Sequence, residues 1–320
     1  MIVALAGGVG GAKLADGLAR LLGRNLSIVV NTGDDFEHLG LHISPDLDTV
    51  MYTLASIANP QTGWGVADES WSFLQQVVRL GGPGWFQLGD RDLATHVLRT
   101  LRLRRGERLT SVTNDFCRQL GIVARILPMS DQPIHTIVDT NEGPLPFQEY
   151  FVARHCAIPV RGFRFEGSAQ AQMTNEVRDI LTGPDLQAII ICPSNPYVSI
   201  DPILSVPGIT QLVQARPVPV VAVSPIIGGA AVKGPAAKMM RELGFDVSSK
   251  SIAAHYRGLV DALVIDLTDA ALKPAIEAMG IQVRVAQTLM RSPEDRRALG
   301  DVCVEVARAF IEEKRLRSVP

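Results

Sequence analysis

Short apolar runs alternate along the chain with segments whose apolar residues recur at helical spacing, as in 12–22 after the run 2–5. This alternation predicts an α/β fold, a Rossmann-like parallel sheet with helices on both faces. The predicted strands are 2–5, 26–30, 122–127, 188–191, 218–223 and 262–266. The predicted helices lie near 46–58, 69–80, 91–104, 110–120, 171–182, 235–243, 248–258, 269–279 and 294–315.

The stretch from Ser130 to Gly167 breaks this rhythm. Residues 136–139, 146–152 and 160–165 have strand-like patterns with no helix between them, and 141–144 has the composition of a hairpin turn. We therefore expect an antiparallel β insertion. The chain then divides into a Rossmann-like N-terminal part with the ligand site (1–129), the insertion (130–170) and the remainder of the α/β core, which completes the crevice (171–320).

Composition and charge exclude several function classes. A formal charge of −2 provides no basic field for nucleic acid. The four cysteines are far apart in the sequence, so we expect them to be reduced and mostly buried. The apolar start of the chain is too short for a leader or a membrane span, which predicts a cytoplasmic protein. The richest basic stretch is interpreted as a solvated helix end and its turn, with an anion-binding patch as the alternative: Arg99, Arg102, Arg104, Arg105 and Arg108.

A glycine-rich turn joins the first strand to the first helix. Its sequence is Gly7-Gly8-Val9-Gly10-Gly11-Ala12-Lys13. Glycines at the start of a helix let backbone N–H groups approach a phosphate closely. The spacing matches neither a Walker A loop nor the dinucleotide-binding pattern. A tight turn that packs without a ligand is the alternative explanation.

Acidic residues follow the second strand. Asn31-Thr32-Gly33-Asp34-Asp35 comes directly after it, at the edge of the sheet where open α/β sheets bind ligands. Farther on, Asp46 and Asp48 flank the start of a predicted helix. Asp46 can cap that helix, and two carboxylates at i and i+2 cannot both do so. Asp48 is therefore expected to be free to hold Mg²⁺ or a ligand hydroxyl.

Further candidate groups lie at later helix starts and strand ends. Arg91, between two aspartates, either belongs to a helix cap with a surface ion pair or points into the crevice as a donor to a phosphate or heterocycle. Polar or glycine-rich loops at 193–200, 224–230 and 233–236 favour one composite site at one rim of the sheet. His96 and His255 are interpreted as packed or solvated rather than catalytic.

Six segments together resemble the 2-phospho-L-lactate transferase family of coenzyme F420 biosynthesis, in order from residue 1 to about residue 290. They are Gly7–Lys13, Ile43–Thr49, Leu88–His96, Ile126–Asp131, Pro193–Pro196 and Ser224–Gly228. The resemblance implies transfer of a phospholactyl or phosphoenolpyruvyl group from a guanosine diphosphate-activated donor to the primary hydroxyl of the deazaflavin Fo, with release of GMP. It also implies Mg²⁺ dependence and a homodimer.

The resemblance assigns roles by position. Asp48 and Arg91 match the family's Fo-contacting residues, and Asp48 or Asp35 is the candidate for metal ligation or hydroxyl activation. The expected donor-binding residues are Gly8, Gly10, Gly11, Lys13, Asn31, Ser194, Asn195 and Gly228. The glycine-rich turn is closer to the bacterial type, which favours phosphoenolpyruvate as the transferred moiety and dehydro-F420 as the product.

Two other functions are weighed against this one. A related branch with similar glycine-rich openings contains nucleotide-sugar-binding regulators of cell-wall metabolism, which are not transferases. An NAD-dependent oxidoreductase is disfavoured by the malformed dinucleotide pattern. The segments around Asp46, Asp48 and Arg91 favour the transferase.

Overall fold

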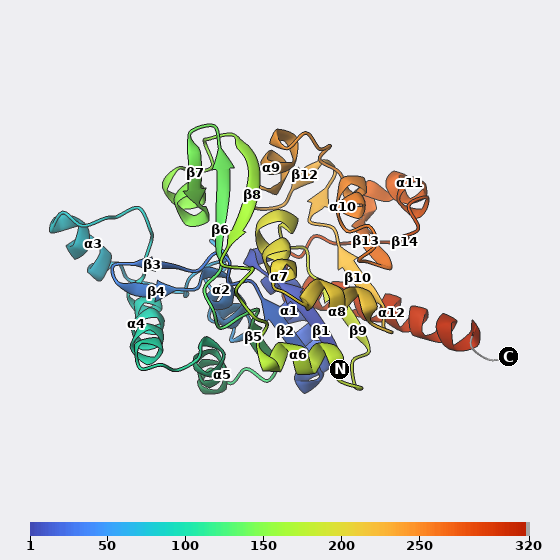
Figure 1. Cartoon of the computed structure of the whole chain (residues 1–320), viewed down its shortest axis with the longest axis horizontal. Helices are drawn as coiled ribbons and strands as arrows, with labels where there is room; N and C mark the ends of the chain where they lie inside the picture. Colours follow the sequence, from blue (N-terminus) through green and yellow to red (C-terminus); the bar gives the residue numbers. More distant parts are fainter. Residues whose placement is uncertain (318–320) are drawn as a thin grey trace.

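The computed structural model describes residues 1–317, with side chains described to residue 313. Its centre is a seven-stranded sheet in which every neighbouring pair of strands is parallel (Figure 1). The strand order is β14-β13-β10-β9-β1-β2-β5. The strands are β1 (Ile2–Ala6), β2 (Leu26–Val30), β5 (Arg125–Pro128), β9 (Ala188–Ile191), β10 (Val220–Val223), β13 (Ala262–Asp266) and β14 (Gln282–Ala286).

Helices cover both faces of this sheet, which confirms the predicted α/β fold. Strands buried on both sides are apolar along their whole length, and alternate residues face opposite layers. In β1, Ala4 packs with one layer and Leu5 with the other. The Ala4 layer contains α1 (Gly8–Leu22), α2 (Pro45–Leu54), α5 (Leu109–Gln119) and α12 (Pro293–Arg317). The Leu5 layer contains α6 (Asn175–Thr182), α7 (Asp201–Ser205), α8 (Ile209–Ala215), α9 (Ala236–Glu242), α10 (Ser249–His255) and α11 (Lys273–Glu277).

The strand order reverses beside β1. From β1 the chain builds β2 and β5 on one side, then crosses to β9, β10, β13 and β14 on the other. The loops that leave the carboxyl ends of β1 and β9 therefore diverge and open a crevice, which is where open α/β sheets bind ligands. Strands from both 1–129 and 171–320 share this one sheet; the division of the chain at these boundaries stays a prediction.

The insertion forms a three-stranded antiparallel sheet that stands apart from the main sheet (Figure 1). Its strands are β6 (His135–Thr140), β7 (Gly143–Pro146) and β8 (Val160–Glu166). The strand predicted for 146–152 is wrong, because β7 ends at Pro146 and Glu149–Ala153 forms a π-helical segment. Phe147 and Phe151, four positions apart, stack with ring centroids 5.4 Å apart, as residues on one helix face can.

The predicted helices are present, with ends shifted by a few residues, and several short elements had no clear sequence signal. Besides the last strand of the main sheet, the prediction missed the helices α7 and α8 and the hairpins β3 (Phe36–His38) with β4 (Leu41–Ile43) and β11 (Ile226–Ile227) with β12 (Ala230–Ala231). The described residues also form the α-helices α3 (Ser72–Arg79) and α4 (Asp90–Arg104) and short 3-10 helices at Gly23–Asn25 and Leu267–Leu272.

Two further expectations concern the whole chain. The four cysteines are free and buried, as predicted. Within residues 1–317, no helix combines the length and the apolar character needed to cross a bilayer.

Candidate active site

A cavity of about 650 Å³ opens at the carboxyl ends of β1, β9 and β10. The glycine-rich turn and the start of α2 line it together with the loops at 193–199, 224–227 and 232–236. The composite rim predicted from the sequence therefore lies around one cavity. Its polar wall contains four carboxylates, those of Asp34, Asp46, Asp48 and Asp92.

Aromatic side chains line the mouth of this cavity. Trp64, Trp85 and Phe86 come from the segment between α2 and α4, and Phe147 and Phe151 come from the insertion. The wall between Phe147 and Val152 includes part of the first π-helical segment, and Val198 and Ser199 belong to a second, Pro196–Ile200. Single π-helical turns are frequent at functional sites.

The glycine-rich turn is packed tightly against protein atoms. A Cβ atom at Gly10 would lie 2.4 Å from the carbonyl oxygen of Pro193, and one at Gly11 would lie 2.4 Å from Ser194 Oγ. Gly8 has a φ of +61°, which other residues rarely adopt. Close packing therefore accounts for these glycines without a ligand. Gly8, Gly10 and Lys13 nevertheless line the cavity, whereas Gly11 does not.

Protein groups already bind the first amides of this turn. Gly7 N–H donates to Ser194 Oγ at 3.1 Å, and Gly8 N–H donates to Asp46 Oδ1 at 2.7 Å. The expectation that Asp46 caps α2 is wrong, because its carboxylate faces the start of α1 instead. Asn31 Nδ2 donates to Asp46 Oδ2 at 2.9 Å, so Asn31 holds that carboxylate and does not itself line the cavity.

Asp34 and Asp46 form a pair of buried acidic side chains on the cavity wall. Burial raises the pKa of Asp46 to about 6. Burial and the charge of Asp46 raise the pKa of Asp34 well above its usual range. Asp34 Oδ1 is buried and has no hydrogen-bond partner. Two adjacent carboxylates with raised pKa values and an unsatisfied oxygen fit a site for a divalent cation.

Asp48 lines the cavity but is not free, in contrast to the prediction. Arg99 pairs with both of its oxygens, Nη1 donating to Oδ2 at 3.0 Å and Nη2 to Oδ1. The interpretation of Arg99 as part of a solvated helix end is wrong, because only 2% of its side chain is exposed. Burial lowers the pKa of Arg99, but the charge and the hydrogen bonds of Asp48, together with the nearby Tyr52 and Asp35, outweigh burial and raise the pKa, so the guanidinium stays charged.

His96 bridges this ion pair to a second carboxylate. Its Nδ1 lies 3.7 Å from Asp48 Oδ2, and its Nε2 lies 3.1 Å from Asp92 Oδ1 without the alignment of a hydrogen bond. Tyr52 OH donates to Asp92 Oδ1 at 2.7 Å. His96 also lines the cavity, so the interpretation of it as merely packed missed its position. The spacing of Asp92, His96 and Arg99 along α4, at i, i+4 and i+7, was the available signal.

Asp48, Asp92 and His96 offer ligand atoms within 4.8 Å of one another, the arrangement of a candidate metal site. However, Arg99 already binds both oxygens of Asp48. A cation placed there would face the guanidinium charge and compete with it. The Asp34–Asp46 pair, which has no such cation among its contacts, is the better candidate.

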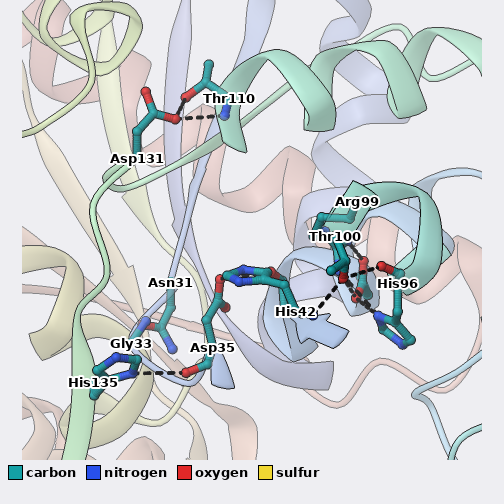
Figure 2. A network of polar contacts seen from close by, with 12 residues as sticks. Asn31, Gly33, Asp35, His42, His96, Arg99, Thr100, Thr110, Asp131 and His135 are labelled. Carbon is teal, nitrogen blue, oxygen red and sulfur yellow. Dashed lines mark hydrogen bonds and ion pairs between the residues drawn. The ribbon is translucent and has the colours of Figure 1, made fainter. Parts of the chain in front are cut away.

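Asp35 does not line the cavity. Its Oδ2 accepts hydrogen bonds from Ser44 Oγ at 2.8 Å and lies 3.1 Å from His42 Nε2, and its backbone oxygen lies 3.1 Å from His135 Nδ1 (Figure 2). Burial raises the pKa of Asp35, although His42 and Ser44 oppose the shift. Asp35 therefore binds His42, Ser44 and His135, and it does not border the cavity that a substrate would occupy.

Arg91 lies in a neighbouring cavity of about 480 Å³, and Tyr52 borders both cavities. Its Nη1 donates to the carbonyl oxygen of Ala67 at 3.0 Å. The two aspartates beside Arg91 have different partners. The Asp90 carboxylate accepts hydrogen bonds from the first amides of α3, whereas Asp92 accepts one from Tyr52. The structure thus does not bring Arg91 beside Asp48.

The later rim residues predicted to bind the donor differ in whether they line the cavity. Ser194 and Asn195 line the cavity, although Ser194 Oγ also donates to Gly7 O at 2.8 Å and Asn195 Oδ1 accepts from Tyr197 N–H at 3.0 Å. Gly228 does not line the cavity, and its N–H donates to the Asp269 carboxylate at 3.2 Å. Of the expected donor-binding residues, Gly8, Gly10, Lys13, Ser194 and Asn195 face the cavity.

Comparison with known proteins identifies the family. Residues 2–299 match the family model of 2-phospho-L-lactate transferase CofD. The chain belongs to this family. It is 41% identical over 301 residues to a phosphoenolpyruvate transferase of Kitasatospora aureofaciens, covering 92% of this chain and 93% of that protein. It is 39% identical over 304 residues to a 2-phospho-L-lactate transferase of Methanosarcina acetivorans, covering 95% of this chain and 98% of that protein.

A solved structure supports the fold alone. A protein of the UPF0052 family from Bacillus halodurans superposes with a TM-score of 0.57 over 89% of this chain and 92% of its own, at 14% sequence identity. The α/β architecture is therefore shared with a distant protein. The CofD-type transferase is identified by the sequence relatives.

Proposed function

We propose that this CofD-type transferase moves a phosphoenolpyruvyl or 2-phospho-L-lactyl group from a guanosine diphosphate-activated donor to the deazaflavin Fo in coenzyme F420 biosynthesis. The observation that carries the proposal is the match, over more than nine tenths of this chain, to relatives named for each of these two transfers. The bacterial type of the glycine-rich turn favours the phosphoenolpyruvyl group. A cavity of about 650 Å³ at the strand-order reversal offers room for substrates of this class.

The reaction is a phosphoryl-type displacement. The primary hydroxyl of Fo attacks the phosphorus nearer the organic acid, the bond from that phosphorus to the bridging oxygen breaks, and GMP leaves with that oxygen. The hydroxyl proton passes to a base, and the product is a phosphodiester of Fo. Such a transfer needs mainly positioning and neutralisation of charge, so a site without a covalent nucleophile is sufficient.

Asp48 is the proposed acceptor-side residue. Arg99 fixes the orientation of its carboxylate, and an ionised carboxylate retains further lone pairs that can accept a hydrogen bond from a hydroxyl of Fo. Arg91, the other residue proposed for Fo, lies in the neighbouring cavity, so its contact with Fo requires the acceptor to extend past Tyr52. Asp35, the alternative to Asp48, supports the site through His42 and Ser44.

Mg²⁺ is the proposed cation, and the residues present fit it. Asp34 and Asp46 supply buried carboxylate oxygens on the cavity wall, one of which has no partner. We therefore propose Asp34 and Asp46 as holders of the metal in place of Asp48 and Asp35. When bound, the ion would neutralise the phosphate oxygens. Gly8, Gly10, Lys13, Ser194 and Asn195 are the proposed donor-side residues.

Product analysis tests the proposal. The protein is incubated with Mg²⁺, Fo and each guanylylated acid in turn, and the product masses are read. We expect an Fo phosphodiester and GMP, with no turnover by Asp48→Asn. The absence of an Fo-derived phosphodiester with every donor would reject the function. An unchanged rate in Asp48→Asn would reject only the role of that residue.

The nucleotide-sugar-binding regulator is the second candidate. Measured binding of UDP-sugars with no affinity for Fo would favour it.

A homodimer is proposed from the family resemblance. The outer face of α4 exposes Val97, Leu98 and Leu101, which makes it a candidate contact surface. Light scattering at several protein concentrations measures the mass. A monomer at all concentrations would contradict the dimer.

A further inference from the structure

The cavity wall has more acidic than basic side chains, although Arg99, which does not line it, pairs with Asp48. Four aspartates line it, whereas two lysines, Lys13 and Lys233, are the only lysine or arginine residues among the described residues of the wall. A donor with a diphosphate and a carboxylate would be repelled by this wall unless cations neutralise it. A metal between Asp34 and Asp46 would remove part of the repulsion. The two lysines are the protein's own contribution.

Lys233 lies where three segments meet. It belongs to the loop between β12 and α9, and its Nζ donates to the carbonyl oxygen of Thr62 at 3.1 Å in an exposed position. A Cβ atom added at Gly63 would lie 2.8 Å from Val9 Cγ1 and 3.4 Å from Lys233 Nζ. The loop at 59–65, the loop at 232–236 and the glycine-rich turn therefore meet beside this exposed ammonium group at the cavity wall.

Lys13 approaches the same region from α1. Its Nζ donates to the carbonyl oxygen of Met290 at 3.0 Å. Burial lowers the pKa of Lys13, and the positive charges of Arg296 and Lys233 lower it further. Both lysines are thus hydrogen-bonded to neutral carbonyls, and their charges repel each other. An anionic oxygen between them would relieve that repulsion and replace a neutral acceptor by a charged one.

We propose that Lys233, together with Lys13, binds an anionic group of the activated donor and positions it against the glycine-rich turn. This inference rests on the proposed function and assigns to it a residue on a loop remote in sequence from that turn. On binding, Lys233 exchanges the Thr62 carbonyl for the donor anion.

Three variants test the role of Lys233. Lys233→Gln removes the charge, Lys233→Arg retains it, and Lys250→Gln removes an exposed lysine on α10 that does not line the cavity. Calorimetry measures binding of GDP and of inorganic pyrophosphate without Fo, at low and high salt. Steady-state kinetics gives KM for the donor and for Fo. Loss of one charge-assisted hydrogen bond weakens binding by about tenfold or more.

For Lys233→Gln we expect a donor KM raised about tenfold with an unchanged KM for Fo, near-normal values for Lys233→Arg, and wild-type values for Lys250→Gln. Weaker GDP binding in Lys233→Gln would show that the lysine contacts the diphosphate. Unchanged GDP binding with a raised donor KM would show that it contacts the acid carboxylate.

Other results overturn the assignment. If GDP binding and donor KM both change less than about twofold in Lys233→Gln, Lys233 does not bind the donor. The assignment is also overturned if the wild type binds neither GDP nor pyrophosphate. A wild type that binds GDP but forms no Fo product refutes the proposed function alone, because the calorimetric comparison of the variants still decides the role of Lys233.

Discussion

The buried ion pair between Asp48 and Arg99 allows the most direct test of the site's energetics. Their side chains are 6% and 2% exposed, so each charge depends on the other for its stabilisation. Removing one partner of a buried pair leaves an uncompensated charge and costs about 3–5 kcal/mol. Arg99→Met and Asp48→Asn should each lower the free energy of unfolding by about that amount, which corresponds to a fall in Tm of roughly 4–7 °C for a chain of this size.

The double variant distinguishes the ion pair from simple loss of packing. Replacing both charges together leaves no unpaired buried charge, so Asp48→Asn with Arg99→Met should lose less than the sum of the single losses. The expected coupling is about 2 kcal/mol or more. Urea unfolding followed by circular dichroism measures all four proteins of the cycle. Additivity of the two single losses within about 0.5 kcal/mol would refute the inference that the pair is energetically linked.

Three further predictions concern the cavity wall. In the presence of EDTA, the raised pKa of Asp46, about 6, means that the folded state holds a proton that the unfolded state has released, so stability should fall by on the order of 2 kcal/mol as pH rises from 4 to 6. Urea unfolding at several pH values should show a smaller fall for Asp46→Asn, because only the Asp34 carboxyl of the pair remains; an equal fall in the variant would contradict the assignment. Mg²⁺ should raise the Tm of the wild type in a thermal-shift assay but not that of Asp34→Asn; an equal rise would place the metal elsewhere. Gly10→Ala should lower the free energy of unfolding by about 1–3 kcal/mol, because the added Cβ clashes with Pro193, and chemical unfolding measures this loss. Gly162→Ala, with no atom near its added Cβ, should leave the free energy of unfolding unchanged, and equal stability of the two variants would contradict the close approach.

The sequence by itself determined the layers of the fold. Strands such as β1 and β9 are buried on both faces, so their residues are apolar throughout, and helices such as α1 show a helical period. These are local signals, read within a few residues. The same locality explains the error at 146–152, where aromatic residues at helical spacing resemble a short strand.

The tertiary structure alone decided which polar groups meet. Asp46 had a plausible partner nearby at the start of α2, but its carboxylate binds Gly8, which is 38 positions away. Asp48 was expected to be free, yet Arg99, from a stretch interpreted as solvated, pairs with it across 51 positions. Lys233 and Thr62, 171 positions apart, meet in the same way. Such contacts leave no periodic trace in the sequence, because they depend on how the sheet brings distant loops to one edge.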